Sequence, residues 1–370
     1  MQFFLDQCLQ SIQAACKNIT FEIIVVDNNS SDGSCDMIKK KFPSVRMIRN
    51  TGNVGFSRAN NQGVTKANGE YILILNPDTV LAEDTLEKVL SFADTKKKLG
   101  VVGVHFIDGS GKLLPECKRN IPTLKIATEK LFGKSINYYA SQIEENSTAK
   151  VDILSGAFML IKRSIFNEVR GFDEDYFMFG EDIDLCYKIV NAGYQNYYFG
   201  ESTVLHYKGE STVKDISYLK NFYGAMQLFY KKHFKENKIL NLVGKIVIKG
   251  FVSYKSLQIK KVKDEMKKAQ KIVLISKNKE MLKKIANDSI EEAIKIESDV
   301  PDNLTNFDMI IFDNEYLSNR DIINALKGLE HLNISKRIIP KNSDFYLGSD
   351  SSIVKGEIVF FGKDELILSE

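Results

Sequence analysis

The chain has few cysteines, and their spacing does not suggest a structural framework. Its five cysteines among 370 residues are an odd number, and no two of them have CxxC spacing. This pattern argues against a set of disulfides and against a zinc site. We therefore expect a protein that works in a reducing compartment.

Long apolar runs and targeting signals are also missing. No uncharged apolar run reaches the roughly 20 residues that a membrane-spanning helix requires. The first basic residue is Lys17, and the apolar residues before it recur at helical spacing, unlike those of a signal peptide. We expect a cytoplasmic protein that does not cross a bilayer.

The net charge of +3 hides an uneven distribution, because residues 208–271 hold 16 lysines against five acidic residues. Within residues 236–267, apolar residues and lysines fall on opposite sides of a predicted helix. Such a basic amphipathic helix could hold the protein at an anionic membrane surface, peripheral to the inner face of the plasma membrane. It could equally pack on a neighbouring domain with its lysines in water. Nucleic acid is not an expected partner, because no nucleic-acid-binding motif accompanies the basic residues.

Short apolar segments alternate with helical patterns, which predicts an α/β protein. Segments 21–26, 45–48 and 71–75 read as strands, and the helical patterns between them indicate βαβ units in a parallel sheet. Segment 71–75 is apolar throughout, as in a strand buried on both faces. We predict a first domain at residues 1–235, a helical linker at 236–267 and a small α/β domain at 268–370. We assign no elements to 109–150.

Two aspartates follow predicted strands directly. Asp27 ends the strand at 21–26, and Asp78 follows the strand at 71–75 after Pro77, which stops the strand. Ligands of open α/β sheets bind beyond such strand ends. Two carboxylates there suit a hard cation such as Mg²⁺ or Mn²⁺ together with a diphosphate. The alternative is that each aspartate only caps its own turn.

Three carboxylates cluster in "FGEDIDLCYKI", where Glu181, Asp182 and Asp184 begin a predicted helix. The preceding aromatic run "DYFMF" could shield one of them from water, a setting in which a carboxylate acts as a general base toward a hydroxyl. They could instead only complement the helix dipole. His206, at another strand end, is a structural residue or, beside Asp78, a metal ligand.

Six segments in this order resemble the family 2 glycosyltransferases with the GT-A fold, especially the rhamnosyltransferase-like branch of bacterial surface-polysaccharide enzymes. The resemblance covers about residues 1–230. It rests on "VVDNNSSDGS", "NTGNVGFSRANNQG", "LNPDTVL", "SGAFMLIKRS", "GFDEDYFMFGEDIDL" and "HYKGES".

The resemblance implies a mixed, mainly parallel sheet flanked by helices. It also implies an inverting transfer of a sugar from a nucleoside-diphosphate donor to a hydroxyl of a saccharide or lipid-linked saccharide acceptor. Asp182 would be the catalytic base, and Asp78 and His206 would bind the metal, Mg²⁺ or Mn²⁺. The donor would be bound by Asp27, Asn29, Gly55, Asn76, Asp78 and Glu181.

Two departures from the family pattern stand out. Asn76 replaces the first carboxylate of the DxD-like element. The family usually opens with a hydrophobic strand and a turn that holds the nucleotide base, whereas this chain begins in the helix that follows. We therefore expect either a preceding segment or a domain without a central strand and part of its donor pocket. The second case would favour a non-catalytic module that binds a sugar or a partner.

The C-terminal unit carries no recognisable functional motif. Its first predicted strand, "KIVLIS", is followed by "KNKEM" without a glycine fingerprint, so dinucleotide binding has little support. No glycine-rich basic loop suited to a triphosphate is visible either, which disfavours a sugar nucleotidyltransferase.

Overall fold

The computed structural model describes residues 1–123, 125–126, 129, 136–208, 216–234, 271–285, 294–353, 355–361 and 366–368. The predicted basic helix and its linker at 236–267 lie outside these residues. The predicted α/β class is confirmed, because sheets and helices alternate along the described chain. No described helix is both long and apolar enough to span a membrane.

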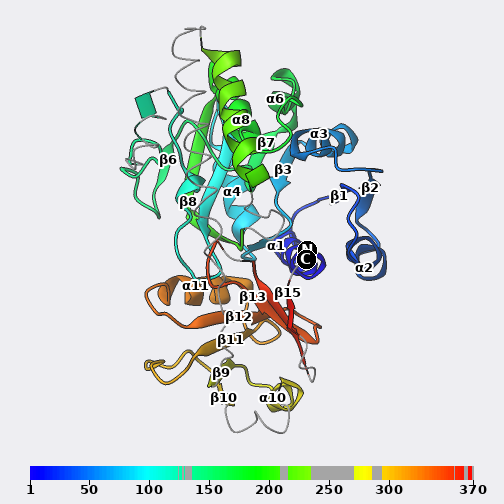
Figure 1. The fold of residues 1–370 in the computed structure, drawn as a ribbon, viewed down its shortest axis with the longest axis vertical. Helices are drawn as coiled ribbons and strands as arrows, with labels where there is room; N and C mark the ends of the chain where they lie inside the picture. The colour runs from blue at the N-terminus through cyan, green and yellow to red at the C-terminus, as the bar shows by residue number, and fades with distance from the viewer. Residues whose placement is uncertain are drawn as a thin grey trace.

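The N-terminal unit is a βαβ arrangement beside a leading helix (Figure 1). Its two strands pair in parallel, with Ile24 opposite Arg46. Its elements are α1 (Gln2–Ala15), β1 (Ile24–Asp27), α2 (Ser34–Lys41), β2 (Arg46–Arg49) and α3 (Phe56–Lys66). The predicted strand at 21–26 is thus shorter at its start, and Asp27 is its last residue.

A mixed six-stranded sheet forms the centre of the molecule, with the order β3-β7-β5-β8-β4 and β6 paired to β8. Only β5 and β8 pair in parallel, and the other pairs in this sheet are antiparallel. Its strands are β3 (Tyr71–Leu75), β4 (Thr79–Leu81), β5 (Leu99–Ile107), β6 (Thr148–Lys150), β7 (Phe158–Lys162) and β8 (Gln195–His206).

Two local expectations for this sheet were wrong. β3 does not pair in parallel, because its neighbour is the antiparallel β7 from a distant part of the chain. The sequence pattern predicts two strands, "YQNYYF" at 194–199 and "STVLHY" at 202–207, but they form one strand, β8, whose pairing with β5 shifts register midway. The sheet is covered by α4 (Thr85–Asp94), α6 (Arg163–Glu168), α7 (Glu181–Asn191) and α8 (Ile216–His233), with a 3-10 turn at Pro115–Cys117.

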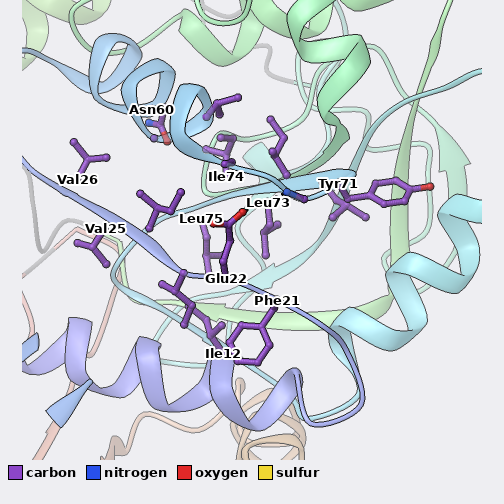
Figure 2. A pocket seen from close by; sticks show the side chains of 18 of the residues that line it. Ile12, Phe21, Glu22, Val25, Val26, Asn60, Tyr71, Leu73, Ile74 and Leu75 are labelled. Atoms are coloured by element: carbon purple, nitrogen blue, oxygen red, sulfur yellow. Dashed lines mark hydrogen bonds between the residues drawn. The ribbon is translucent and has the colours of Figure 1, made fainter. Parts of the chain in front are cut away.

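A cavity of about 570 Å³ separates β1 from β3. Among the described strands, β1 pairs with β2 and β3 pairs with β7, but β1 and β3 do not pair with each other. Figure 2 shows Val25 of β1 and Leu75 of β3 at this pocket, above Ile12 of α1. Because of the cavity, Tyr71, Leu73 and Leu75 are only half-buried, so the prediction of a strand buried on both faces was wrong.

The C-terminal unit is a seven-stranded sheet with the order β10-β9-β11-β12-β13-β14-β15. Its first four strands run parallel and the last three add antiparallel pairs. Its elements are β9 (Ile272–Ile275), α10 (Lys279–Ile285), β10 (Ile294–Glu297), β11 (Met309–Asp313), α11 (Asn319–Gly328), β12 (Ser335–Ile339), β13 (Phe345–Gly348), β14 (Glu357–Phe360) and β15 (Leu366–Leu368).

The C-terminal sheet, yellow to red in Figure 1, packs closely on the rest of the chain. At the start of α11, the backbone N–H groups of Asn319 and Arg320 donate to the Glu83 carboxylate. One buried apolar cluster contains side chains of both parts, among them Phe4, Val80, Ile107 and Leu205 with Val273, Ile310, Phe312 and Leu347. The two sheets therefore share a core, and the domain boundary at 235–268 stays a prediction.

Candidate active site

The structure places Asp78 beside His206. Asp78 directly precedes β4, whose first residue, Thr79, lies opposite His206 of β8 in the sheet. The carbonyl of Asp78 accepts from the backbone N–H of Tyr207 at 3.0 Å. The imidazole Nε2 of His206 consequently lies 3.4 Å from Oδ1 of Asp78, and it also lies 3.5 Å from Nδ2 of Asn76.

The donor atoms of this pair fit a hard or borderline cation. Oδ1 of Asp78 is buried and has no hydrogen-bond partner among the described residues, and Nε2 of His206 lies 3.4 Å from it. A carboxylate and an imidazole suit Mn²⁺, and a carboxylate suits Mg²⁺, with phosphate oxygens and water completing the shell. Within the described residues, no group of three His, Cys, Asp or Glu side chains could hold a metal ion. The chain would thus supply two ligands and leave the other positions open.

Asp182 is held by contacts from two other parts of the chain. Gly180, with φ +78°, precedes α7, so Asp182 lies in the first turn of that helix. Its Oδ2 accepts from Nη2 of Arg119 at 2.6 Å and from the backbone N–H of Gly156 at 3.2 Å. Its side chain is 14% exposed, so the carboxylate is fixed yet reachable.

A short segment, Gly156 and Ala157, connects the two groups of residues. The carbonyl of Ala157 accepts from the backbone N–H of Asn76 at 3.0 Å, while the adjacent Gly156 donates to Asp182. Two hydrogen bonds therefore link this segment to both groups: one to the backbone of Asn76 and one to the side chain of Asp182.

Glu181 differs from Asp182 in its environment. It is buried, and its Oε2 has no hydrogen-bond partner among the described residues. Burial, together with the negative charge of Asp182, raises the pKa of Glu181 to about 8. At neutral pH Glu181 is therefore mostly a neutral acid.

Asp27 and Asn29 form a tight turn at the end of β1. Oδ1 of Asp27 accepts from the backbone N–H of Ser30 at 3.0 Å, and Asn29 has a left-handed φ of 66°. Although burial alone would raise the pKa of Asp27, the hydrogen bond from Ser30 and the nearby Arg49 guanidinium lower it overall. Asp27 thus remains a carboxylate, and Asn29 is exposed beside it.

Gly55 lies between this turn and the loop that contains Phe177, and it contacts both. Its carbonyl accepts from Nδ2 of Asn28 at 3.3 Å, and the next residue, Phe56, donates its N–H to the carbonyl of Phe177 at 2.8 Å. A Cβ at Gly55 would lie 2.6 Å from that carbonyl oxygen. Phe177 itself is 46% exposed, so the expected aromatic cover over the carboxylates is incomplete.

Arg119 belongs to the same group of side chains as Asp182, although no motif in the sequence indicates it. This residue lies in the stretch 109–150, to which no elements were assigned, and it contacts Asp182 across 63 positions of sequence. Its neighbours in "ECKRN" offer no motif. Only the fold reveals the pairing.

Residues 3–170 match the family model described as glycosyl transferase family 2. N-acetylglucosaminyl-diphospho-decaprenol L-rhamnosyltransferase of Mycobacterium tuberculosis is 26% identical over 228 residues, which cover 57% of this chain and 74% of that protein. Rhamnosyltransferase WbbL of Escherichia coli K12 is 28% identical over 214 residues, covering 55% and 78%. Among solved structures, the mannosyltransferase PcManGT from Pyrobaculum calidifontis, in complex with GDP-Man and Mn²⁺, superposes with a TM-score of 0.46 at 16% identity, covering 72% and 73%.

Proposed function

This chain belongs to glycosyl transferase family 2 through residues 3–170, and we propose that it is an inverting, rhamnosyltransferase-like enzyme of cell-surface polysaccharide synthesis. It transfers a sugar from a nucleoside-diphosphate donor to an acceptor hydroxyl. The observation that carries the proposal is the segment Gly156 and Ala157, because one of its residues is hydrogen-bonded to Asp182 and the other to Asn76, two residues before Asp78.

The donor side of the site is built from the turn at Asp27 and Asn29, the loop at Gly55 and the amide of Asn76. Asp78 and His206 would hold Mg²⁺ or Mn²⁺, which when bound neutralises charge on the departing diphosphate. The neutral state of Glu181 supports this assignment, because it limits the negative charge in a site that receives a diphosphate. These residues bind and orient the donor so that its anomeric carbon faces the acceptor.

The acceptor side is Asp182. As the acceptor oxygen forms its bond to the anomeric carbon, the bond to the diphosphate breaks on the opposite face, and the hydroxyl proton moves to the Asp182 carboxylate. Arg119 and Gly156 fix that carboxylate before the acceptor arrives. The name of the mycobacterial relative supports a lipid-linked diphosphate saccharide as the acceptor class.

Acceptors of this kind reside in membranes, so we place the enzyme at the cytoplasmic face of the plasma membrane. The basic segment that would hold it there, 236–267, lies outside the described residues. Co-sedimentation of the chain with anionic and neutral liposomes at low salt distinguishes membrane binding from a helix packed on the enzyme.

A second candidate function is a non-catalytic module that binds a sugar or a partner. The cavity between β1 and β3 favours it, because the sheet is interrupted next to the Asp27 turn. Such a module would bind donors without turning them over.

A donor panel tests the proposed function. The purified chain is mixed with UDP-, dTDP- and GDP-sugars and Mn²⁺ or Mg²⁺, with and without a lipid-diphosphate saccharide. Nucleoside diphosphate release measures transfer, and thermal shift measures donor binding. We expect acceptor-dependent release with one donor, and we expect Asp182→Asn to lose transfer by at least about 10²-fold while still binding that donor.

Each other outcome has a clear meaning. Donor binding without turnover in the unmutated chain would support the binding module. Turnover of Asp182→Asn at the unmutated rate would remove Asp182 as the base. Neither binding nor release with any donor would contradict the transferase.

A further inference from the structure

Arg119 is a buried cation outside every sequence motif, yet its backbone is firmly placed. Its N–H donates to the carbonyl of Ile153 at 2.9 Å, and its own carbonyl accepts from the N–H of Ile153 at 3.0 Å. This reciprocal pair anchors the start of the side chain. The rest of the side chain is 8% exposed, so the guanidinium has little freedom to move.

The guanidinium is aimed at Asp182. Nη2 donates to Oδ2 of Asp182 at 2.6 Å and to the carbonyl of Leu154 at 2.8 Å, and Tyr138 provides a further hydrogen bond. Burial works against the positive charge, but Asp182 and Tyr138 outweigh it, so the pKa of Arg119 lies above its ordinary value. Arg119 is therefore a permanent cation whose charge partner is Asp182.

We propose that Arg119 is a positioning residue for the transfer reaction. It holds the Asp182 carboxylate in a fixed orientation and in its charged form, so that this carboxylate can accept the proton of the acceptor hydroxyl. The inference rests on the proposed function, because it concerns how the proposed base is prepared.

The hydrogen-bond pattern of Asp182 supports this role. Arg119 and Gly156 both donate to Oδ2, whereas Oδ1 receives, among the described residues, only the N–H of the adjacent Ile183, at 2.8 Å. One carboxylate oxygen is thus used for placement. The other has spare acceptor capacity in a side chain that remains partly exposed.

A second buried arginine shows what a purely structural pair looks like here. Arg337, in the C-terminal sheet, donates Nε to Glu357 at 2.5 Å and Nη1 to Asp350 at 2.8 Å. Both Arg337 and Glu357 have side chains less than a tenth exposed. They belong to β12 and β14 of the C-terminal sheet, whereas Asp182 belongs to α7. Arg337 therefore offers a matched control for the loss of a buried guanidinium.

Steady-state kinetics of Arg119→Gln, Arg119→Lys and Arg337→Gln test the proposal, with the donor and acceptor found in the panel. For Arg119→Gln we expect kcat to fall about 10²-fold with little change in donor KM, because the proton acceptor is misplaced and the donor contacts remain.

The other two variants separate charge from geometry and from folding. Arg119→Lys keeps the charge but not the planar guanidinium, so its kcat should remain reduced. Arg337→Gln should lower the melting temperature without changing kcat or donor KM.

Two results would overturn the proposal. One is an Arg119→Gln enzyme that loses thermal stability, as Arg337→Gln does, but keeps the unmutated kcat. The other concerns the double variant Asp182→Asn/Arg119→Gln, which is useful if Arg119→Gln folds poorly. Residues that act as a unit are not additive, so adding Arg119→Gln to Asp182→Asn should cost little further kcat. If it instead lowers kcat by the same factor as in the unmutated enzyme, the proposal is wrong. Failure of the unmutated chain to transfer any sugar would instead count against the proposed function.

Discussion

At the scale of single residues, Glu181 and Asp182 are neighbours with different protonation behaviour. Glu181 is buried with an unsatisfied oxygen, while Asp182 receives Arg119 and the N–H of Gly156. Two adjacent carboxylates in one site do not both ionise easily. Because burial raises the pKa of Glu181 to about 8, Glu181 keeps its proton at neutral pH.

Replacing Glu181 with glutamine should change how stability depends on pH. The pKa of Glu181 in the folded chain lies above its unfolded value. Its contribution to the free energy of unfolding is therefore full below about pH 4.3 and is lost as the pH rises toward 8. Glu181→Gln cannot titrate, so the variant does not lose this free energy as the pH rises. Relative to the unmutated chain, the variant should gain up to about 1.4 kcal/mol of unfolding free energy per pH unit in this window.

Urea unfolding at pH 5, 7 and 9 measures this difference. The exposed Glu70 provides a matched control, since Glu70→Gln should show a nearly constant difference across the three pH values. A constant difference for Glu181→Gln as well would mean that Glu181 is already ionised in the folded chain.

The sequence predicted the residues that lie close together along the chain and missed those that meet only through folding. Glu181 and Asp182 stand out because they begin a helix after a glycine, and Asp78 because Pro77 ends a strand. Arg119 could not be found this way, because its contact with Asp182 depends on the long-range pairing of Arg119 with Ile153. The functional roles of all these residues stay predictions.

At the scale of elements, strand and helix positions follow from local pattern, but strand partners do not. The alternation of apolar and helical segments gives β1, β2 and α3 and their parallel pairing. β7, the partner of β3, follows it by more than 80 residues, so a local sequence pattern cannot predict that the two strands pair antiparallel. β4, only three residues long, lacks enough periodicity to predict.

The loop at Gly55 is the element whose geometry depends most on one residue. Gly55 has φ +86°, and a Cβ there would meet the carbonyl of Phe177. Gly55→Ala should therefore combine backbone strain of about 1 to 2 kcal/mol with a steric clash, and it should weaken donor binding as the loop shifts.

Gly193 offers the comparison, because its φ is +91° but an added Cβ would meet nothing within 4 Å. Gly193→Ala should lower the free energy of unfolding through backbone strain alone, and it should leave donor affinity unchanged. Urea unfolding and donor thermal shift on both variants separate the two effects. Equal losses of stability and equal donor binding would contradict the proposed contact with Phe177.

At the scale of the whole molecule, the two sheets behave as parts of one packed unit. Phe3 of α1 makes edge-to-face contacts with Phe345 at 4.8 Å and Phe360 at 5.3 Å between ring centroids, and the cluster around Phe4 continues into both sheets. The α/β character of the C-terminal unit was evident from its sequence, whereas this shared core was not, because no periodicity indicates which two faces meet.

Phe3→Ala should destabilise the entire chain by about 2 to 3 kcal/mol, since it removes a half-buried ring and two aromatic contacts. Urea unfolding followed by circular dichroism should show one transition displaced as a whole. Phe21→Ala, at a ring that is 47% exposed, should cost less than about 1 kcal/mol. A separate transition for the C-terminal sheet, unmoved by Phe3→Ala, would indicate that the two parts fold independently.

The pocket between β1 and β3 has a consequence for donor geometry. Asp27 ends one strand and Asp78 follows the other, yet no described backbone hydrogen bond ties these two strands to each other. In the proposed donor site, the spacing between Asp27 and Asp78 would therefore depend on side-chain volume at half-buried positions such as Val25 and Leu73. Side chains that touch no reacting atom would then influence which donors fit.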